Sequence, residues 1–295
     1  MTVDRPPSQS SLTRRRFLMG GACAAGGLAL YAGEIERHWI EITRHDVLIP
    51  SLSGAFDGFR IVQLSDIHMD QFTEPFFLRE AIRQINRLNP DAVFLTGDFV
   101  THEFLPRKIS YGPAWQCAGI LAGLKCAQRY AILGNHDITV GAAEVTAALT
   151  ANSITVLNNS YTAVERAGGR FWLSGVDDPL TGDPNPDLAI PVSIRNVPGE
   201  PVVLMCHGPD YADTLRTLPS GQAVSLMLAG HTHGGQIRLP MIGPLVLPRM
   251  GKNYVEGWFR FGKMLLYVNR GLGTVGVPFR FDCPPEITVH TLRSA

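Results

Sequence analysis

The sequence lacks an excess of charge of either sign. Among its 295 residues, 26 lysines and arginines balance 26 aspartates and glutamates, so the formal net charge at pH 7 is zero. Proteins bind nucleic acid mainly through the attraction of basic side chains to phosphates, so we do not expect this chain to bind nucleic acid. The hydrophobic content of 45% is that of an ordinary globular protein.

Cysteine is scarce as well, and its spacing is irregular. The five cysteines include no Cys-x-x-Cys pair. An odd and scattered set argues against a disulfide scaffold, so we expect buried thiols. A bridge between Cys117 and Cys126 stays open as an alternative.

The sequence also lacks a strongly apolar run of the roughly 20 residues that a good membrane span needs. Its nearest approach, residues 17–33, carries no charge but is rich in glycine and alanine. Residues 13–18 read TRRRFL and resemble the twin-arginine export signal, with two consecutive arginines, one free position and then Phe-Leu. We therefore interpret residues 1–33 as a signal read by the twin-arginine translocase, either cleaved or kept as a weak anchor.

This interpretation places the exported protein in the periplasm, in the cell wall or at the outer face of the cytoplasmic membrane. A disordered basic tail before a short helix is the alternative. No internal linker or repeat interrupts residues 34–295, so we expect them to form a single domain.

Short apolar runs alternate with amphipathic stretches from residue 34 onward. Residues 75–88, for example, place Leu78, Ile82 and Ile85 on one helical face. Strands that alternate with helices in this way predict an α/β layered fold. Residues 240–258 are expected to form a long loop or a pair of short strands. We expect helices at 75–88, 113–124, 141–151 and 209–218, a hairpin of 161–165 with 171–176, and further strands at 38–49, 59–64, 92–96, 130–133, 202–205, 225–229, 264–271 and 285–292.

Side chains that can bind metal follow five of these apolar runs at the point where each run ends. In open α/β sheets the ligand site lies at the carboxyl ends of the strands, so these side chains should meet. Asp, His and Asn suit Mn, Fe or Zn. A structural zinc knuckle is disfavoured, because no second cysteine accompanies Cys206 at these motifs and the set is spread too widely along the chain. The candidates are Asp66, His68, Asp98, Asn135, His207, His231 and His233.

Seven candidates are too many for one ion, whereas two ions that share one carboxylate would use them all. Two such ions can hold both the attacking and the leaving oxygen of a phosphoryl displacement. In order, the motifs are Asp-x-His, Gly-Asp, Gly-Asn-His-Asp, a lone His and Gly-His-x-His, and they resemble the calcineurin-like metallophosphoesterases over residues 59–235. The resemblance implies a four-layer α/β/β/α sandwich and makes residues 34–295 a catalytic domain.

The resemblance also implies a role for each candidate. Asp98 would bridge the two metals, and a water or hydroxide held between them would attack phosphorus. His136 would protonate the leaving oxygen or stabilise charge on the phosphate, and Asp137 would hold the His136 ring. The first metal would be bound by Asp66, His68 and His233, and the second by Asn135, His207 and His231.

The chain further resembles the bacterial branch of the family that carries twin-arginine signals, which is related to phosphodiesterases and to enzymes that cleave UDP-2,3-diacylglucosamine. We therefore expect cleavage of a phosphodiester or pyrophosphate bond in a lipid or cell-envelope metabolite. A phosphomonoesterase, a protein phosphatase and a non-catalytic metal-binding scaffold are the alternatives.

Several weaker features stay open. His102 faces either substrate or solvent, and Arg270 meets either a phosphate or a carboxylate. His38, His45 and His290 are expected to be structural residues in strands. The apolar segments 74–78, 240–248 and 272–279 form either a rim for an acyl chain or peripheral membrane contact, or ordinary packing between layers.

Overall fold

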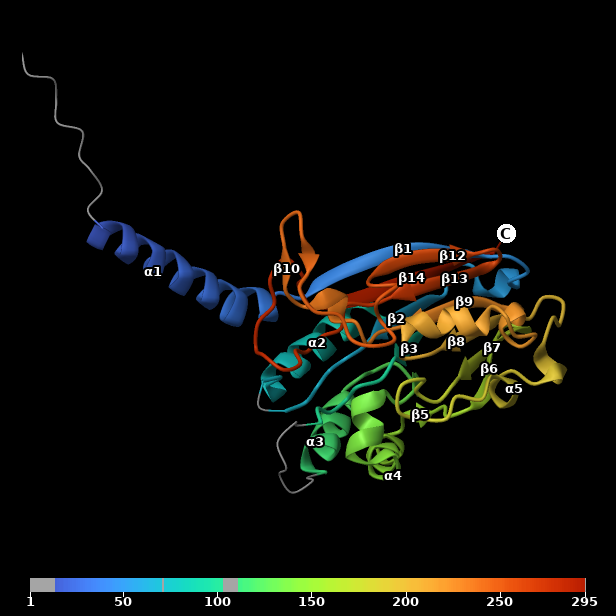
Figure 1. The fold of residues 1–295 in the computed structure, drawn as a ribbon. Coiled ribbons are helices and arrows are strands. Elements are labelled where there is room, and N and C mark those ends of the chain that lie inside the picture. The colour runs from blue at the N-terminus through green and yellow to red at the C-terminus, as the bar shows by residue number, and fades with distance from the viewer. Residues whose placement is uncertain (1–13, 71, 103–110, 295) are drawn as a thin grey trace, which may run out of the picture.

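The computed structural model describes residues 14–70, 72–102 and 111–294, so the first 13 residues of the expected signal lie outside it. Within these residues, two six-stranded sheets form the body of the molecule (Figure 1). The first sheet has the order β1 (Glu41–Ile49), β14 (Glu286–Ser294), β2 (Arg60–Leu64), β3 (Ala92–Leu95), β4 (Gln128–Ala131) and β5 (Thr155–Val156). The second has the order β12 (Gly257–Phe261), β13 (Met264–Val268), β9 (Val224–Ala229), β8 (Val202–Met205), β7 (Gly169–Gly175) and β6 (Ser160–Arg166).

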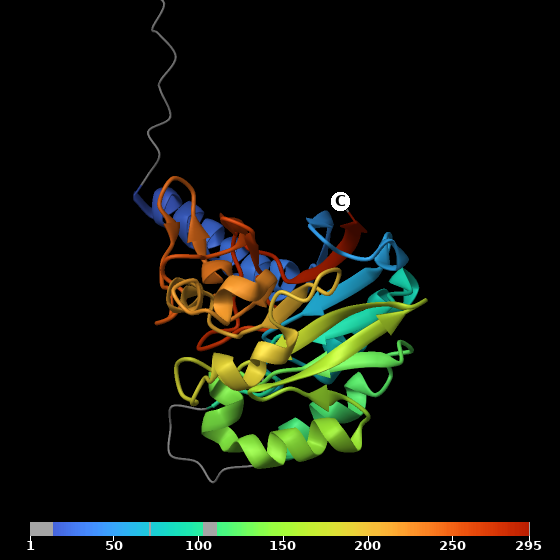
Figure 2. The same ribbon diagram turned by 90° about the vertical axis from the view of Figure 1, so that its right-hand side faces the viewer.

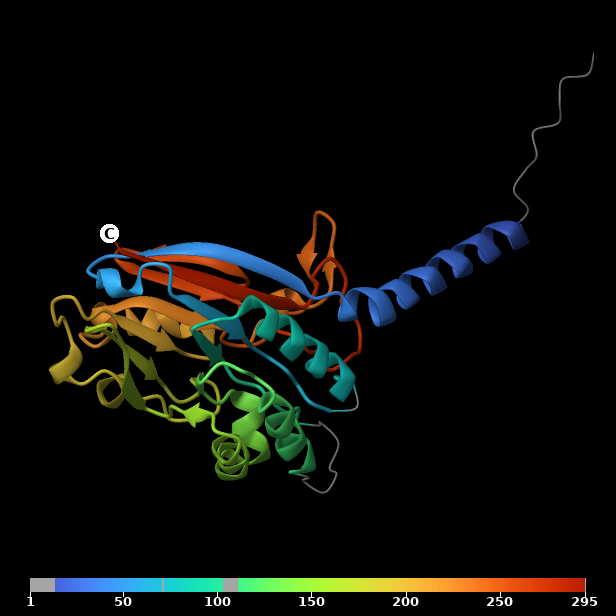
Figure 3. The ribbon, with the colours of Figure 1, turned by 180° about the vertical axis from the view of Figure 1, so that it is seen from behind.

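Helices cover the outer face of each sheet. Figure 3 shows α2 (Pro75–Leu88), α3 (Gly112–Leu121) and α4 (Asn135–Ala151) together on one side of the body. The short α5 (Pro186–Ala189) and α6 (Ala212–Leu215) belong to the other side. A long helix, α1 (Arg14–Leu30), projects from the body and continues through η1 (Tyr31–Ile35) and η2 (Glu36–His38) into β1.

Three buried clusters of apolar side chains hold these layers together. The central cluster joins the facing sides of the two sheets, with Phe94 and Ile61 from the first and Phe171 and Leu226 from the second. A second cluster packs the first sheet against α2, α3 and α4, and a third packs the second sheet against α5 and α6. This order of layers confirms the four-layer α/β/β/α sandwich.

The strand directions bring the start of the chain to the carboxyl ends of the central strands. Strands β2, β3 and β4 are mutually parallel, as are β7, β8, β9 and β13. Strand β14 runs parallel to β1 and antiparallel to β2, with Glu41 opposite Glu286 and Gln63 opposite Thr288. Helix α1 therefore enters the body at the edge where β2 ends.

Most expected elements are confirmed, including the helix at 75–88 and the antiparallel hairpin of β6 with β7. The helix expected at 209–218 is shorter, because it divides into η5 (Pro209–Tyr211) and α6, and Pro219 prevents its extension. The helix expected at 141–151 begins earlier, at Asn135, and is broken at Gly141. Residues 238–244 form a small hairpin of β10 (Arg238–Leu239) with β11 (Gly243–Pro244).

Several open points from the sequence are decided by the structure. The cysteines are free thiols, so Cys117 and Cys126 are not bridged. The prediction that His38 lies in a strand is wrong, because it lies in η2, where its ring contacts Glu74. Of the three apolar segments, 74–78 buries Phe77 and Leu78, and 272–279 buries Leu272 but leaves Val277 exposed. Segment 240–248 leaves most of its large apolar side chains exposed.

Candidate metal centre

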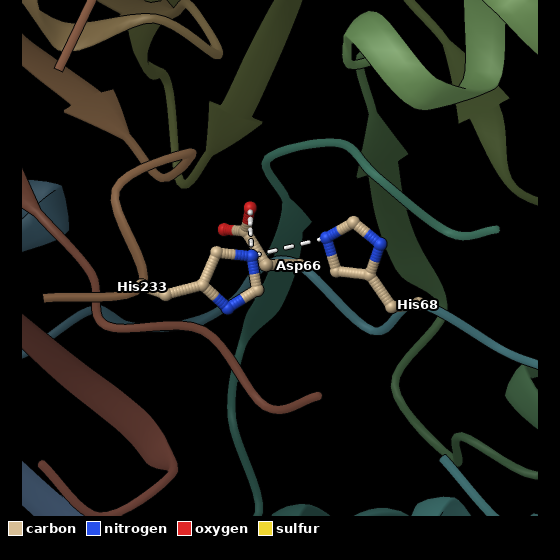
Figure 4. A group of neighbouring side chains, drawn as sticks. All are labelled: Asp66, His68 and His233. Atoms are coloured by element: carbon tan, nitrogen blue, oxygen red, sulfur yellow. Dashed lines mark hydrogen bonds and ion pairs between the residues drawn. The ribbon is translucent and has the colours of Figure 1, made fainter. Parts of the chain in front are cut away.

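The first cluster of candidate ligands consists of Asp66, His68 and His233. Their ligand atoms all lie within 4.8 Å of one another, and the three side chains are buried. Nε2 of His68 is 3.0 Å from Nε2 of His233, which in turn is 3.5 Å from Oδ1 of Asp66. Figure 4 shows the three side chains pointing toward one another, with Asp66 and His68 on the loop that follows β2 and His233 on the segment that follows β9. Two imidazole nitrogens and a carboxylate oxygen thus converge on one point.

The second cluster consists of Asp98, His207 and His231, whose ligand atoms again lie within 4.8 Å of one another. Nε2 of His207 is 3.0 Å from Oδ2 of Asp98 and 3.3 Å from Nδ1 of His231. These residues follow β3, β8 and β9, so side chains from both sheets meet here. The sequence prediction that separate strand ends converge is therefore realised for six of the seven candidates.

Asp98 lies between the two clusters. Its Oδ2 atom is 3.0 Å from Nε2 of His207 in the second cluster and 3.6 Å from Nε2 of His68 in the first. Its Oδ1 atom accepts a hydrogen bond of 2.9 Å from the backbone N–H of His136. This carboxylate is therefore in contact with both clusters.

Asn135 supplies the test of whether a metal fits. Among the described residues, its Oδ1 atom is buried and has no hydrogen-bond partner. A buried acceptor without a partner costs roughly 1–3 kcal/mol, which a bound cation would recover. Oxygen and imidazole nitrogen donors in this number are the set that Mn, Fe or Zn accepts, so the residues present fit a divalent metal.

The histidines present defined nitrogens to the clusters, because hydrogen bonds fix their opposite nitrogens. Nδ1 of His207 is 2.7 Å from the carbonyl oxygen of Thr96, and Nε2 of His231 is 2.6 Å from that of Arg249. A carbonyl only accepts, so each of these nitrogens carries a proton and the opposite nitrogen faces the cluster, where a metal would displace any proton that it holds. Nothing in the sequence marked Thr96 or Arg249, because their role depends on backbone atoms.

Burial sets the charge state of the site. It lowers the pKa of His68 to about 3 and that of His231 to about 4, so both rings are neutral at pH 7, as metal binding requires. Burial raises the pKa of Asp66 to about 6, although His207 opposes the shift. Burial acts the same way on Asp98, but the charges of His207 and His136 outweigh it and hold the pKa of Asp98 well below its usual range.

The backbone at the site is strained. Five of the seven candidate ligands have positive φ angles, although none is a glycine. Non-glycine residues in this left-handed region cost on the order of 1–3 kcal/mol each and persist only where the surroundings enforce them. The φ values are 50° for Asp66, 49° for His68, 56° for Asp98, 74° for His231 and 52° for His233.

Two motif glycines are required by close packing. A side chain at Gly134 would overlap the carboxylate of Asp98, and one at Gly230 would overlap Ser65 and the carboxylate of Asp66. The glycine that precedes each ligand loop therefore makes room for a ligand on a neighbouring loop.

The structure corrects the expected role of Asp137. Its buried carboxylate accepts hydrogen bonds from the backbone N–H groups of Asp98, Gly134, Phe99 and Val100, at 2.8, 3.0, 2.8 and 3.2 Å. The His136 ring instead accepts a hydrogen bond of 2.9 Å at Nδ1 from the backbone N–H of His102. Asp137 thus holds the loop that carries Asp98, and the main chain of His102 orients the His136 ring.

Two arginines border the site. Arg270 pairs with Glu41 at 2.7 Å and Glu286 at 3.3 Å, so it forms the salt bridges that the sequence left as one alternative. Arg280, which the sequence analysis missed, is fully buried and donates to the carbonyl oxygen of Gly273 at 2.6 Å. Its guanidinium also lies 3.4 Å from Nδ1 of His233. No local pattern marks Arg280, because its partners are carbonyls of a folded loop.

A two-sheet sandwich with a buried Asp/His/Asn centre at the carboxyl ends of its strands defines a metallophosphoesterase. Residues 59–235 match the sequence profile of the family described as calcineurin-like phosphoesterase. The chain belongs to the calcineurin-like phosphoesterase family and is a hydrolase of phosphoester bonds.

Three relatives cover nearly all of the chain. It is 37% identical over 294 residues to the metallophosphoesterase YkuE of Bacillus subtilis, covering 96% of this chain and 98% of that one. It is 32% identical over 287 residues to the phosphodiesterase YaeI of Escherichia coli, covering 95% and 99%. It is 27% identical over 317 residues to the UDP-2,3-diacylglucosamine pyrophosphatase LpxG of Chlamydia muridarum, covering 88% and 91%.

Proposed function

We propose that the chain is a dinuclear phosphohydrolase that cleaves a phosphodiester or pyrophosphate bond in a lipid or other cell-envelope metabolite. The observation that carries the dinuclear part is the position of Asp98, whose Oδ2 atom lies within 3.6 Å of a histidine nitrogen in each cluster. Asp66, His68 and His233 would hold one ion and Asn135, His207 and His231 the other. Two bound divalent ions would supply a nucleophile at neutral pH and neutralise phosphate charge.

His136 is the residue that we assign to the phosphate. It belongs to a third group, with His68 and Asp98, whose ligand atoms also lie within 4.8 Å of one another. Since the N–H of His102 donates to Nδ1, the ring proton resides on Nε2. That N–H can donate to a phosphate oxygen or to the leaving oxygen as charge develops there. The hydrogen bond at Nδ1 favours the charge-stabilising role over full proton transfer.

The substrate class rests on the relatives and on the N-terminus. YaeI is named a phosphodiesterase and LpxG a pyrophosphatase of a diacylated nucleotide sugar. Residues 15–38 form one helix that is long and apolar enough to cross a membrane, by length and composition. We therefore propose that residues 1–33 address the chain to the twin-arginine translocase, and that the catalytic domain of residues 34–295 acts at the cell envelope.

The test uses the full-length chain, stripped of metal with a chelator and then given Mn, Fe or Zn. Metal content per chain and hydrolysis of bis(p-nitrophenyl) phosphate and p-nitrophenyl phosphate are measured. We expect two ions per chain and a preference for the diester, with Asp98→Ala losing about 100-fold or more of the activity. The control is Asp46→Ala, since Asp46 is an exposed aspartate that pairs with Arg293. One ion per chain would contradict the dinuclear centre, and preference for the monoester would contradict the substrate class.

A further inference from the structure

The C-terminal end of the long N-terminal helix is built into the catalytic body. The carbonyl oxygen of Ala32 accepts a hydrogen bond of 3.0 Å from the backbone N–H of Arg280. Gly33 packs so tightly that an added Cβ would lie 2.9 Å from the ring of Phe279. The Glu36 carboxylate accepts a hydrogen bond of 2.7 Å from the N–H of Cys283. These contacts tie residues 32–36 to the body and fix the direction in which α1 leaves it.

Among the residues that the structure describes, those of the projecting part of α1 are exposed and not packed against the body. Large apolar side chains are exposed along it, and residues 15–38 meet the length and composition of a membrane span. A helix of this kind that is fixed at one end is suited to serve as a membrane anchor for the body that holds it. The exposed side chains are Phe17, Leu18, Met19, Leu28 and Leu30.

A second apolar surface lies beside the root of this helix. The segment 241–246, which includes the tip of the β10–β11 hairpin, exposes Met241 completely and Ile242 to 71%. Figure 1 shows this hairpin close to the end of α1 that joins the body, and in Figure 2 it is seen over the outer turns of the same helix. Phe281 links the two, because its carbonyl accepts from the N–H of Arg238 at 2.9 Å and its ring packs edge-on against Tyr31, with centroids 6.4 Å apart.

The metal centre lies at the same edge of the molecule. Strand β9 delivers His231 and His233, and β10 begins at Arg238 directly after them. The register of β1, β14 and β2 brings the chain from α1 into the body beside the end of β2, which delivers Asp66. Anchor helix, apolar tip and metal centre thus share one edge.

We propose that the tip segment 241–246 rests in the lipid bilayer that α1 enters, so that the metal centre faces the membrane surface. An exposed apolar patch of this kind marks an interaction site, and the fixed anchor next to it makes lipid its partner. In this arrangement residues 14–33 stay attached to the mature protein. The presentation of lipid head groups to the metal centre rests on the proposed function, whereas the contact of the tip with lipid does not.

The first experiment reads membrane contact without measuring activity. An environment-sensitive fluorophore is attached to the cysteine of an Ile242→Cys variant of the full-length chain. Cys23→Ser and Cys126→Ser remove the more accessible native thiols from this variant. The labelled protein is placed in phosphatidylcholine/phosphatidylglycerol nanodiscs at one copy per disc. The control is Val192→Cys, since Val192 is 78% exposed and follows α5, at the far end of the body from α1 in Figure 1. We expect quenching by shallow spin-labelled lipid at residue 242 and none at 192. Equal quenching at residues 242 and 192 would overturn the proposal. Quenching at residue 242 that appears only with several copies per disc would also overturn it, because a second copy of the chain would then be the partner of the tip segment.

The second experiment separates this proposal from the proposed function. Met241→Asp with Ile242→Asp is compared with Leu188→Asp with Val192→Asp, on soluble bis(p-nitrophenyl) phosphate and on a diacylglycerol p-nitrophenyl phosphodiester in vesicles. We expect the tip variant alone to lose about tenfold on the vesicle substrate and nothing on the soluble one. Equal losses on both substrates would overturn the proposal. Absence of hydrolysis in the parent chain, with quenching at residue 242 intact, would refute the proposed function and leave the membrane contact standing.

Discussion

The carboxylate of Asp137 accepts a hydrogen bond of 2.8 Å from the backbone N–H of Asp98. Together with the bonds from Phe99, Val100 and Gly134, this contact fixes two ligand loops to one buried carboxyl group. Asp137 therefore acts through the position of Asp98 rather than through the neighbouring ring of His136.

Asp137→Asn tests this role, because an amide presents an NH₂ group to N–H donors that need an acceptor. We expect metal affinity to fall about 10- to 100-fold, with much of the activity recovered at high metal concentration. Metal titration of the stripped protein and activity as a function of metal concentration provide the readout. If affinity were unchanged and only kcat fell at saturating metal, Asp137 would act on His136 after all.

Gly230→Ala tests the packing between ligand loops. The new methyl group would overlap Ser65 and the Asp66 carboxylate, so we expect the first ion to be lost together with most of the activity. The matched control is Gly54→Ala, since an added Cβ at Gly54 meets nothing within 4 Å. Circular dichroism shows whether the variant stays folded while metal content per chain is counted. Full metal content in Gly230→Ala would refute this account of the motif glycine.

His290 makes stability depend on pH. Burial lowers its pKa to about 3 from 6.5 in the unfolded chain. Between pH 6.5 and pH 3, His290 is therefore protonated in the unfolded chain but neutral in the folded chain. As the pH falls through this range, the free energy of unfolding decreases by up to about 1.4 kcal/mol per pH unit. His290→Gln keeps a donor for Gln63, which the ring contacts at 3.0 Å, but cannot titrate. Urea unfolding across this pH range should show a shallower slope in the variant, and equal slopes would contradict the prediction.

Arg280 is expected to be a structural requirement. Its buried guanidinium donates to carbonyl oxygens of residues 270–273 and 283, which a shorter ammonium group cannot satisfy together. We expect Arg280→Lys to lower the free energy of unfolding by about 3 kcal/mol. Arg293→Lys, at a partly exposed arginine, should change it by less than about 1 kcal/mol. Denaturant unfolding of both variants compares the two costs.

The clustering of the candidate metal ligands can be predicted from the sequence, because it follows from the direction of the strands that precede them. Asp66, Asp98 and His207 each follow a short apolar strand, and parallel strands deliver their carboxyl ends to one edge. The partners of Asp137 and of the His136 ring could not be predicted, because they are backbone N–H groups whose positions exist only in the folded loops.

The same limit applies to the N-terminus. The sequence leads us to interpret residues 1–33 as an export signal, but it does not reveal that Ala32 and Gly33 contact the distant segment 278–280. Pro219 similarly limits the helix expected at 209–218 through a restriction on the residue before it, which periodicity alone does not register.

The left-handed backbone at the candidate ligands suggests that metal binding and folding are coupled. Five of the seven candidate ligands are held in this left-handed conformation by the fold around them. An ion that binds the folded chain alone stabilises it in proportion to the logarithm of its concentration. Divalent ions bound at this centre would therefore stabilise the whole sandwich, and we expect the fraction of folded chain to rise with the supply of divalent metal.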